Sequence, residues 1–334
     1  MIPLRSKKIR FSSALLSFRR SVQSSSDPLL SDPFHDHKKM VRGSNKQFPK
    51  PHFISFDVFG TLYTPKAPIA QQYHVVAMEE FGINKSLESI EKEFPKIYSE
   101  IYERYPNYGK RSSDIKNCDE WWLEIIVKLF DLPHYTKDET SAKLCRRLLT
   151  YFTGREAYMV YDDVIPTLTK LKENNINLVV SSNSDLRVME ILKNLGLMDF
   201  FAKDHIYLSY DLDASKPDKK FFDSVYQRFL ASTLETPSDV SKQLYLENCW
   251  HIGDSEDKDF LGPVRSGWNA VLLDRENTSQ FLIHSHSPQK PITKSLFAEH
   301  SDEGINSPEL KVIANNRVVL RNLDQLLAIF GLHD

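Results

Sequence analysis

The sequence predicts an α/β fold in which a doubly wound parallel sheet is interrupted after its first strand by a helical insertion. Two observations lead to this prediction. After Asp162, short apolar strand candidates alternate with helical stretches, a pattern that builds right-handed βαβ units with helices covering a parallel sheet. Between about residues 65 and 158, apolar residues instead recur three and four positions apart, as they do in packed helices.

The first half of the chain is expected to contain one strand and then only helices. Residues 52–57 form a short apolar run closed by Gly60 and Thr61, which is typical of a buried strand followed by a turn. Helical spacing then predicts four helices, at residues 69–81, 87–105, 120–130 and 141–152. An insertion at this place is expected to lie over the carboxyl ends of the strands, where open α/β sheets bind ligands.

The second half is expected to complete the sheet. Strands are predicted at residues 177–181, 206–209, 249–253, 269–273 and 318–320, and helices at 164–173, 186–195, 218–229 and 323–330. Gly196 supplies a usual helix stop. The core domain is therefore assigned to residues 51–64 and 159–334, with the helical insertion at 65–158. Within the core, the polar and proline-containing stretch 276–309 is predicted to be a surface insertion.

The amino terminus differs in composition from the rest of the chain. Residues 1–26 contain six basic residues, many serines and no acidic residue, which is typical of a mitochondrial transit peptide. Residues 27–50 are predicted to be a disordered linker. We therefore expect a mitochondrial location, and the alternative is a basic tail without a targeting function on a cytoplasmic protein.

Composition excludes several classes of protein. The net charge of −2 argues against a nucleic-acid-binding domain, which usually carries a basic excess. No apolar run reaches the roughly 18 residues that a membrane-spanning helix needs. The three cysteines are widely spaced and indicate buried thiols rather than disulfides or a zinc site. The sequence does not indicate an oligomeric state.

Polar residues recur just after the predicted strands or at the start of the next helix. They are Asp57, Ser182 with Asn183, Lys216, and Asp254 with Asp259. One such residue alone usually caps a turn or a helix. Four groups of this kind, in order and at comparable strand ends, favour a shared site.

These residues resemble the four motifs of the haloacid-dehalogenase-like hydrolase superfamily. Phe-Asp-Val-Phe-Gly-Thr-Leu at 56–62 resembles motif one, Ser-Asn at 182–183 motif two, Lys-Pro-Asp at 216–218 motif three, and Gly-Asp-Ser at 253–255 with Asp259 motif four. The helical insertion falls where the superfamily has its cap. Residues 105–109 (Tyr-Pro-Asn-Tyr-Gly) followed by Trp121 and Trp122 resemble the cap of the branch called hydrolase domain-containing protein 3, or rhythmically-expressed-gene-2-like.

The resemblance implies a role for each residue. Asp57 would be the nucleophile that forms a covalent aspartyl intermediate, Ser182 would donate a hydrogen bond to the substrate, and Lys216 would offset negative charge. Asn183 and Thr61 would contact the substrate. The expected Mg²⁺ ligands are Asp57, the carbonyl of Phe59 and Asp254, which offer the hard oxygen atoms that this ion prefers. Asp259 would be a further carboxylate at the metal or a partner for Lys216.

Phe59 departs from the pattern of the phosphatases in this superfamily, which have a second aspartate there as general acid and base. Loss of such a group typically costs about 10²- to 10⁴-fold in rate. The favoured function is a Mg²⁺-dependent phosphatase, weakened by Phe59, that acts on a small anionic metabolite. The alternatives are a binding protein without turnover and a haloacid-type dehalogenase. Dehalogenases also need an early cap arginine, and Arg104 is the nearest downstream candidate.

Overall fold

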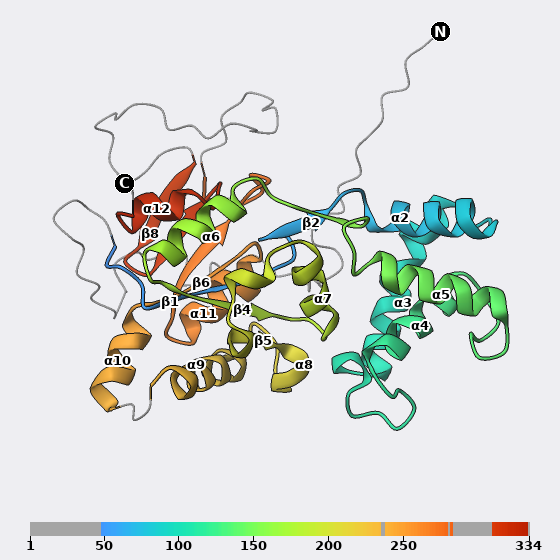
Figure 1. Cartoon of the computed structure of the whole chain (residues 1–334), viewed down its shortest axis with the longest axis horizontal. Helices are drawn as coiled ribbons and strands as arrows, with labels where there is room; N and C mark the ends of the chain where they lie inside the picture. Colours follow the sequence, from blue (N-terminus) through green and yellow to red (C-terminus); the bar gives the residue numbers. More distant parts are fainter. Residues whose placement is uncertain (1–47, 235–237, 280, 283–308, 333–334) are drawn as a thin grey trace, which may run out of the picture. The chain divides into compact units, whose positions relative to one another are not determined.

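A computed structural model describes residues 48–234, 238–279, 281–282 and 309–332 (Figure 1). The predicted transit peptide at 1–26, most of the predicted linker at 27–50 and most of the predicted surface insertion at 276–309 lie outside these residues. The described residues form two compact units. One is Pro65–Thr150, and the other contains the described residues from 48 to 64 and from 151 onward.

The second unit is built on a sheet whose seven described strands have the order β5-β4-β1-β6-β7-β9-β8. Neighbouring strands are parallel except β8 and β9, which are antiparallel. In chain order the strands are β1 (Phe53–Phe56), β4 (Asn177–Ser182), β5 (Ile206–Leu208), β6 (Cys249–Gly253), β7 (Asn269–Leu273), β8 (Leu310–Ala314) and β9 (Arg317–Leu320).

Helices cover both faces of this sheet, which confirms the predicted doubly wound α/β class (Figure 1). The alternation along β6 shows it directly. Cys249 packs in a core cluster with Phe229, while the next residue, Trp250, has its ring 5.3 Å from that of Phe330. The central strands β1, β6 and β7 are buried along their whole length, as expected for parallel strands covered on both faces.

The helices of this unit are α6 (Val164–Glu173), α7 (Arg187–Asn194), α8 (Ser209–Leu212), α9 (Lys219–Thr233), α10 (Asp239–Glu247), α11 (Gly262–Arg265) and α12 (Gln325–Ile329), with short helical turns η3 (Met198–Phe200), η4 (Lys203–His205) and η5 (Glu256–Leu261). Four of these helices occur where they were predicted, α6 with the predicted bounds and α7, α9 and α12 with shifted ends. Helices α8, α10 and α11 and strand β8 were not predicted from the sequence.

A separate two-stranded sheet joins β2 (Tyr63–Pro65) to β3 (Tyr158–Val160). The sequence predicts no strand at either place, because three residues are too few to display a period of two. This small sheet brings the chain just before the helical unit next to the chain just after it. Its residues Tyr63 and Tyr158 also line the region around the predicted nucleophile, as described below.

The unit Pro65–Thr150 contains α2 (Ile69–Val75), η1 (Val76–Glu80), α3 (Leu87–Arg104), η2 (Asn107–Gly109), α4 (Cys118–Leu129) and α5 (Glu139–Tyr151, whose last residue lies in the other unit). The single helix predicted at 69–81 is an α-helix that continues as a π-helical turn. Trp121 is fully buried and its Nε1 donates to the Tyr105 carbonyl at 3.0 Å. Among the helices of the described residues, none combines the length and apolar character that a membrane crossing requires.

Candidate active site

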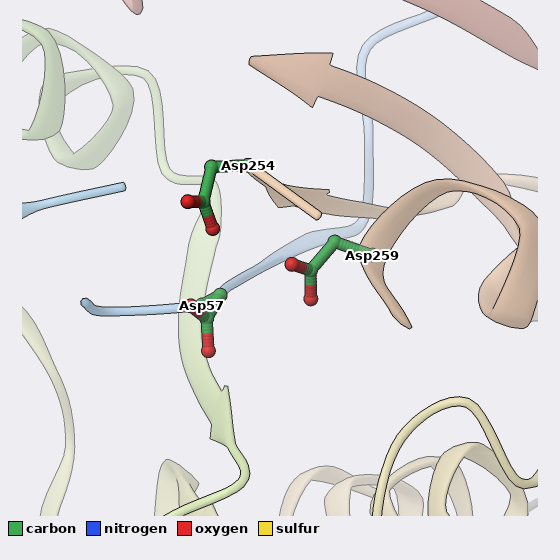
Figure 2. Close-up of side chains that lie close together, drawn as sticks. All are labelled: Asp57, Asp254 and Asp259. Atoms are coloured by element: carbon green, nitrogen blue, oxygen red, sulfur yellow. The ribbon is translucent and has the colours of Figure 1, made fainter. Parts of the chain in front are cut away.

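Three carboxylates predicted from the sequence meet at the carboxyl ends of two neighbouring strands. Asp57 follows β1 and Asp254 follows β6, and the two strands are paired in parallel with Phe56 opposite Ile252. Asp259 lies on the helical turn η5 that comes next. One oxygen from each of the three carboxylates lies within 4.8 Å of the others (Figure 2). The strand register therefore explains why residues about 200 positions apart in the chain are neighbours.

Two glycines give these carboxylates the space they need. A Cβ atom at Gly60 would lie 2.4 Å from Oδ2 of Asp254, and one at Gly253 would lie 2.4 Å from Cγ of Asp259. Both distances are far below normal van der Waals contact. Gly60 also has a φ of +81°, which side chains other than glycine rarely tolerate. Any larger residue at either position would displace a carboxylate.

Lys216 holds two of the carboxylates together. Its Nζ donates to Oδ1 of Asp57 at 2.8 Å and to Oδ1 of Asp259 at 2.6 Å, and the residue is only 3% exposed. Burial alone would lower the pKa of Lys216, but Asp259 and Asp57 outweigh it and raise the pKa. For Asp259, burial would raise the pKa, but the charge of Lys216 and the hydrogen bond from His251 lower it below the usual value. Lys216 and Asp259 are thus an ionised buried pair.

Asp254 is in the opposite situation. Burial, followed by repulsion from Asp259 and Asp57, raises its pKa to about 8. Lys216 only partly offsets this. A carboxyl group with a raised pKa beside two other carboxylates is suited to a divalent cation, whose charge would replace the missing counter-charge. The donor set consists of hard oxygen atoms, and Mg²⁺ prefers these ligands. The residues present therefore fit the predicted metal.

The motif-two residues lie beside this cluster. Ser182 ends β4 and is buried. The side-chain amide of Asn183 donates to the Lys216 carbonyl at 2.8 Å and accepts from the Lys216 main-chain N–H at 2.7 Å. Asn183 thereby fixes the main chain from which the Lys216 side chain extends. This gives Asn183 a positioning role, and its predicted contact with substrate stays a prediction.

Thr61 is fully buried, and its hydroxyl has no hydrogen-bond partner among the described residues. Its carbonyl accepts from Arg275 at 3.0 Å. The same guanidinium group binds both carboxylate oxygens of Asp163, at 2.8 and 2.9 Å, and lies 3.9 Å from the centre of the Tyr161 ring. Arg275 therefore clamps the loop that follows the nucleophile, a role that the sequence did not indicate.

Phe59 stands where phosphatases of the superfamily have the aspartate that acts as general acid. It packs in a group of three aromatic rings. Its centroid lies 6.0 Å from that of Tyr63 and 6.3 Å from that of Tyr158, both in edge-to-face geometry. Burial raises the pKa of Tyr158 to about 12, and burial, with Tyr158 and Asp57 nearby, raises that of Tyr63 well above its usual value. Both phenols therefore stay protonated near neutral pH and are poor proton donors to a leaving group.

Sequence reasoning also missed His251, which is fully buried on β6. Its Nε2 lies 3.0 Å from Oδ1 of Asp259 and its Nδ1 lies 3.0 Å from Oγ of Ser55. A signal was available, because a histidine inside an otherwise apolar strand must find hydrogen-bond partners when buried. His251 lies two residues before Gly253 in the same strand, so both residues are on the face of the strand that is turned toward Asp259.

Comparisons with known proteins identify the family of the chain. The family model for haloacid dehalogenase-like hydrolases matches residues 53–267. An uncharacterised protein of Saccharomyces cerevisiae is 31% identical over 84% of this chain and 93% of its own length. The haloacid dehalogenase-like hydrolase domain-containing protein 3 of Mus musculus is 23% identical over 73% of this chain and 90% of its own length. These matches confirm the superfamily and the branch inferred from the motifs.

The fold is also found in solved structures. A hydrolase of Bacillus subtilis, solved with bound magnesium, aligns with a TM-score of 0.51 over 84% of this chain and 99% of its own. Its sequence identity to this chain is 18%, so the likeness shows the fold alone.

Proposed function

The chain belongs to the haloacid dehalogenase-like hydrolase family, and from this premise we propose that it is a Mg²⁺-dependent phosphatase of small anionic metabolites. The observation that carries the proposal is the charge arrangement around Asp57. A buried ammonium group touches Asp57, and a second carboxylate with a raised pKa lies beside it. This arrangement holds a nucleophilic carboxylate next to a site for a cation, which a phosphate dianion needs before a carboxylate can attack it.

In the proposed reaction, Oδ2 of Asp57 attacks phosphorus, because Oδ1 is held by Lys216. The bond from phosphorus to the leaving oxygen breaks, and an aspartyl phosphate forms on Asp57. Water then hydrolyses this intermediate and returns the free carboxylate. A bound Mg²⁺ would supply charge neutralisation and orientation of the phosphoryl group, and Asp57 and Asp254 would hold it, with the Phe59 carbonyl as a further ligand.

We assign Asp259 to Lys216 rather than to direct contact with the metal. Both of its oxygens already accept hydrogen bonds, Oδ1 from Lys216 and His251 and Oδ2 from the Ser255 main-chain N–H. Of the two roles expected for Asp259 from the sequence, we therefore propose the pairing with Lys216.

The leaving group must depart without a strong acid, since Phe59 carries no proton and the nearby phenols have raised pKa values. The proposed substrates are therefore phosphate compounds whose leaving group is stable as an anion, such as acyl or aryl phosphates. Alkyl phosphates, whose leaving alkoxides are strongly basic, are expected to react slowly.

The test is release of inorganic phosphate from a panel of acyl, aryl and alkyl phosphates, with Mg²⁺ and with a chelator. Asp57→Asn is the matched control, because it keeps the shape of the side chain and removes the nucleophile. Release that needs both Mg²⁺ and Asp57 supports the proposal. Release of halide from a 2-haloacid without Mg²⁺ would favour a dehalogenase, and no turnover of either kind would favour a binding protein.

A further inference from the structure

A row of buried polar side chains runs behind the nucleophile, across three adjacent strands. Oγ of Ser181 on β4 lies 2.7 Å from Oγ of Ser55 on β1. Ser55 in turn lies 3.0 Å from Nδ1 of His251 on β6, whose Nε2 lies 3.0 Å from Oδ1 of Asp259. The row ends at Lys216, which contacts Asp259 and Asp57. Polar groups in a sheet core are costly unless each has a partner, and here each has one.

In the contact between Nε2 of His251 and Oδ1 of Asp259, the histidine must be the hydrogen-bond donor. Oδ1 of Asp259 already accepts from the Lys216 ammonium, and a carboxylate in that position can only accept further hydrogen bonds. His251 must therefore carry a proton on Nε2 and donate a hydrogen bond from this N–H to Oδ1 of Asp259. Oγ of Ser55 contacts the other ring nitrogen, Nδ1, and this contact fixes the orientation of the ring.

Asp259 is held in one place by these contacts. Lys216 and His251 bind Oδ1, and the Ser255 main-chain N–H binds Oδ2 at 3.0 Å. Gly253 packs so closely against the Asp259 side chain that a Cβ there would collide with it. Lys216 has a flexible four-carbon stem, so its ammonium group needs contacts that hold it in place. Asp259 supplies one of them, and Asp57 supplies the other.

We propose that His251 is a positioning residue for catalysis, which fixes the carboxylate of Asp259 and thereby holds Lys216 against Asp57. The inference rests on the proposed function, in which Lys216 offsets the charge of nucleophile and phosphate. It differs from a purely structural role. His251 also packs against Phe222, with ring centroids 5.5 Å apart, and a residue that only filled this space could be replaced by an apolar side chain.

Three substitutions separate the two roles. His251→Gln keeps an N–H near the position of Nε2, His251→Asn is polar but too short to reach Asp259, and His251→Leu fills the space without a donor. His205→Leu is the matched control, because that histidine lies at η4, beside the edge strand β5, and hydrogen-bonds to Ser232. Each variant is compared with wild type in kcat and KM for phosphate release with saturating Mg²⁺.

We expect His251→Leu and His251→Asn to lower kcat at least tenfold and to change KM less than threefold. Both variants lose a hydrogen bond to the charged Asp259, which positions Lys216 and through it the nucleophile. His251→Gln should restore kcat to within about threefold of wild type, and His205→Leu should leave it unchanged. Equal kcat in the Leu, Asn and Gln variants would overturn the proposal. If the Leu variant does not fold, the Gln and Asn pair decides alone.

Crystal structures of wild type and the Asn variant provide a test that does not depend on activity. We expect Asp259 to rotate and the distance from Lys216 Nζ to Asp57 Oδ1 to lengthen beyond hydrogen-bond range in the Asn variant. An unchanged distance would refute the positioning role. If wild type releases no phosphate from any substrate, the proposed function fails, and these structures still decide what His251 does.

Discussion

Replacement of Asp254 by asparagine should stabilise the metal-free protein, although it removes a predicted catalytic ligand. In the folded chain, burial and the charges of Asp259 and Asp57 raise the pKa of Asp254 from 3.8 to about 8. A carboxyl group whose pKa is raised on folding binds its proton more tightly in the folded state. Above about pH 4, Asp254 loses its proton more readily in the unfolded chain than in the folded one. This difference favours unfolding at every pH above that value. Asparagine has nearly the same shape and never ionises.

The size of the effect follows from the two pKa values. One pH unit corresponds to about 1.4 kcal/mol, so the penalty is absent below pH 4, reaches an upper limit of about 4 kcal/mol at pH 7, and levels off at about 6 kcal/mol above pH 8. Asp254 retains some exposure to solvent, and screening by water reduces these values. We expect a stabilisation of about 2 kcal/mol at pH 7, which corresponds to roughly 4–8 °C in Tm for a unit of this size.

The assay is thermal unfolding followed by circular dichroism, in a chelator, at pH 5, 7 and 9. The difference in Tm between Asp254→Asn and wild type should be small at pH 5 and should grow toward pH 9. Added Mg²⁺ should raise the Tm of wild type and narrow the gap, because a ligand that binds only the folded state stabilises it. Asp257→Asn is the control, since Asp257 is an exposed carboxylate paired with Arg265.

Two results would refute the reasoning. One is an Asp254→Asn variant that melts at or below the wild-type temperature at pH 9 without metal. The other is a difference in Tm that does not depend on pH. An equal gain from Asp257→Asn would show that the effect comes from net charge rather than from the buried cluster.

Three further predictions test other parts of the site. Phe59→Asp should raise the turnover of alkyl phosphates about 100-fold and make the rate less dependent on the pKa of the leaving group; no gain in a folded variant would show that the missing acid is not the limiting defect. Gly253→Ala should lower kcat at least tenfold in steady-state assays, because its Cβ would displace Asp259; wild-type kcat would contradict this. Arg275→Met should cost about 3 kcal/mol in urea unfolding, since it leaves the carboxylate of Asp163 without its charged partner; a loss below 1 kcal/mol would mean that the clamp is not needed.

The sequence predicted the central sheet because its strands carry strong local signals. β1, β6 and β7 are short apolar runs with glycine nearby. β6 and β7 have the predicted bounds, and β1 is one residue shorter at each end than predicted. The two-stranded sheet of β2 and β3 was missed because each strand has three residues and its partner is about 95 positions away. The antiparallel edge strand β8 follows the stretch predicted as a surface insertion, where the alternation of strand and helix breaks down.

The candidate site could be predicted to the extent that its residues lie at strand ends. Asp57 and Asp254 follow neighbouring strands, so parallel pairing alone brings them together. The partners that set their chemistry could not be predicted, because they depend on which atoms touch. Asn183 binds the main chain of Lys216, and His251 reaches Asp259 from inside a strand. A histidine inside an apolar strand does indicate a need for buried partners, but residue types along the chain do not indicate which atoms such contacts join.

The energetics of the cluster argue that it is kept for function. Lys216 and Asp259 form a satisfied pair that a fold could retain for its own sake. Asp254 does not contribute to stability in this way, because its pKa of about 8 means that its ionised form destabilises the folded chain. An asparagine at this position would fit the same space without that penalty. A carboxylate that weakens the fold and faces two others is what a cation site requires, and this conclusion holds whether or not Phe59 slows the chemistry.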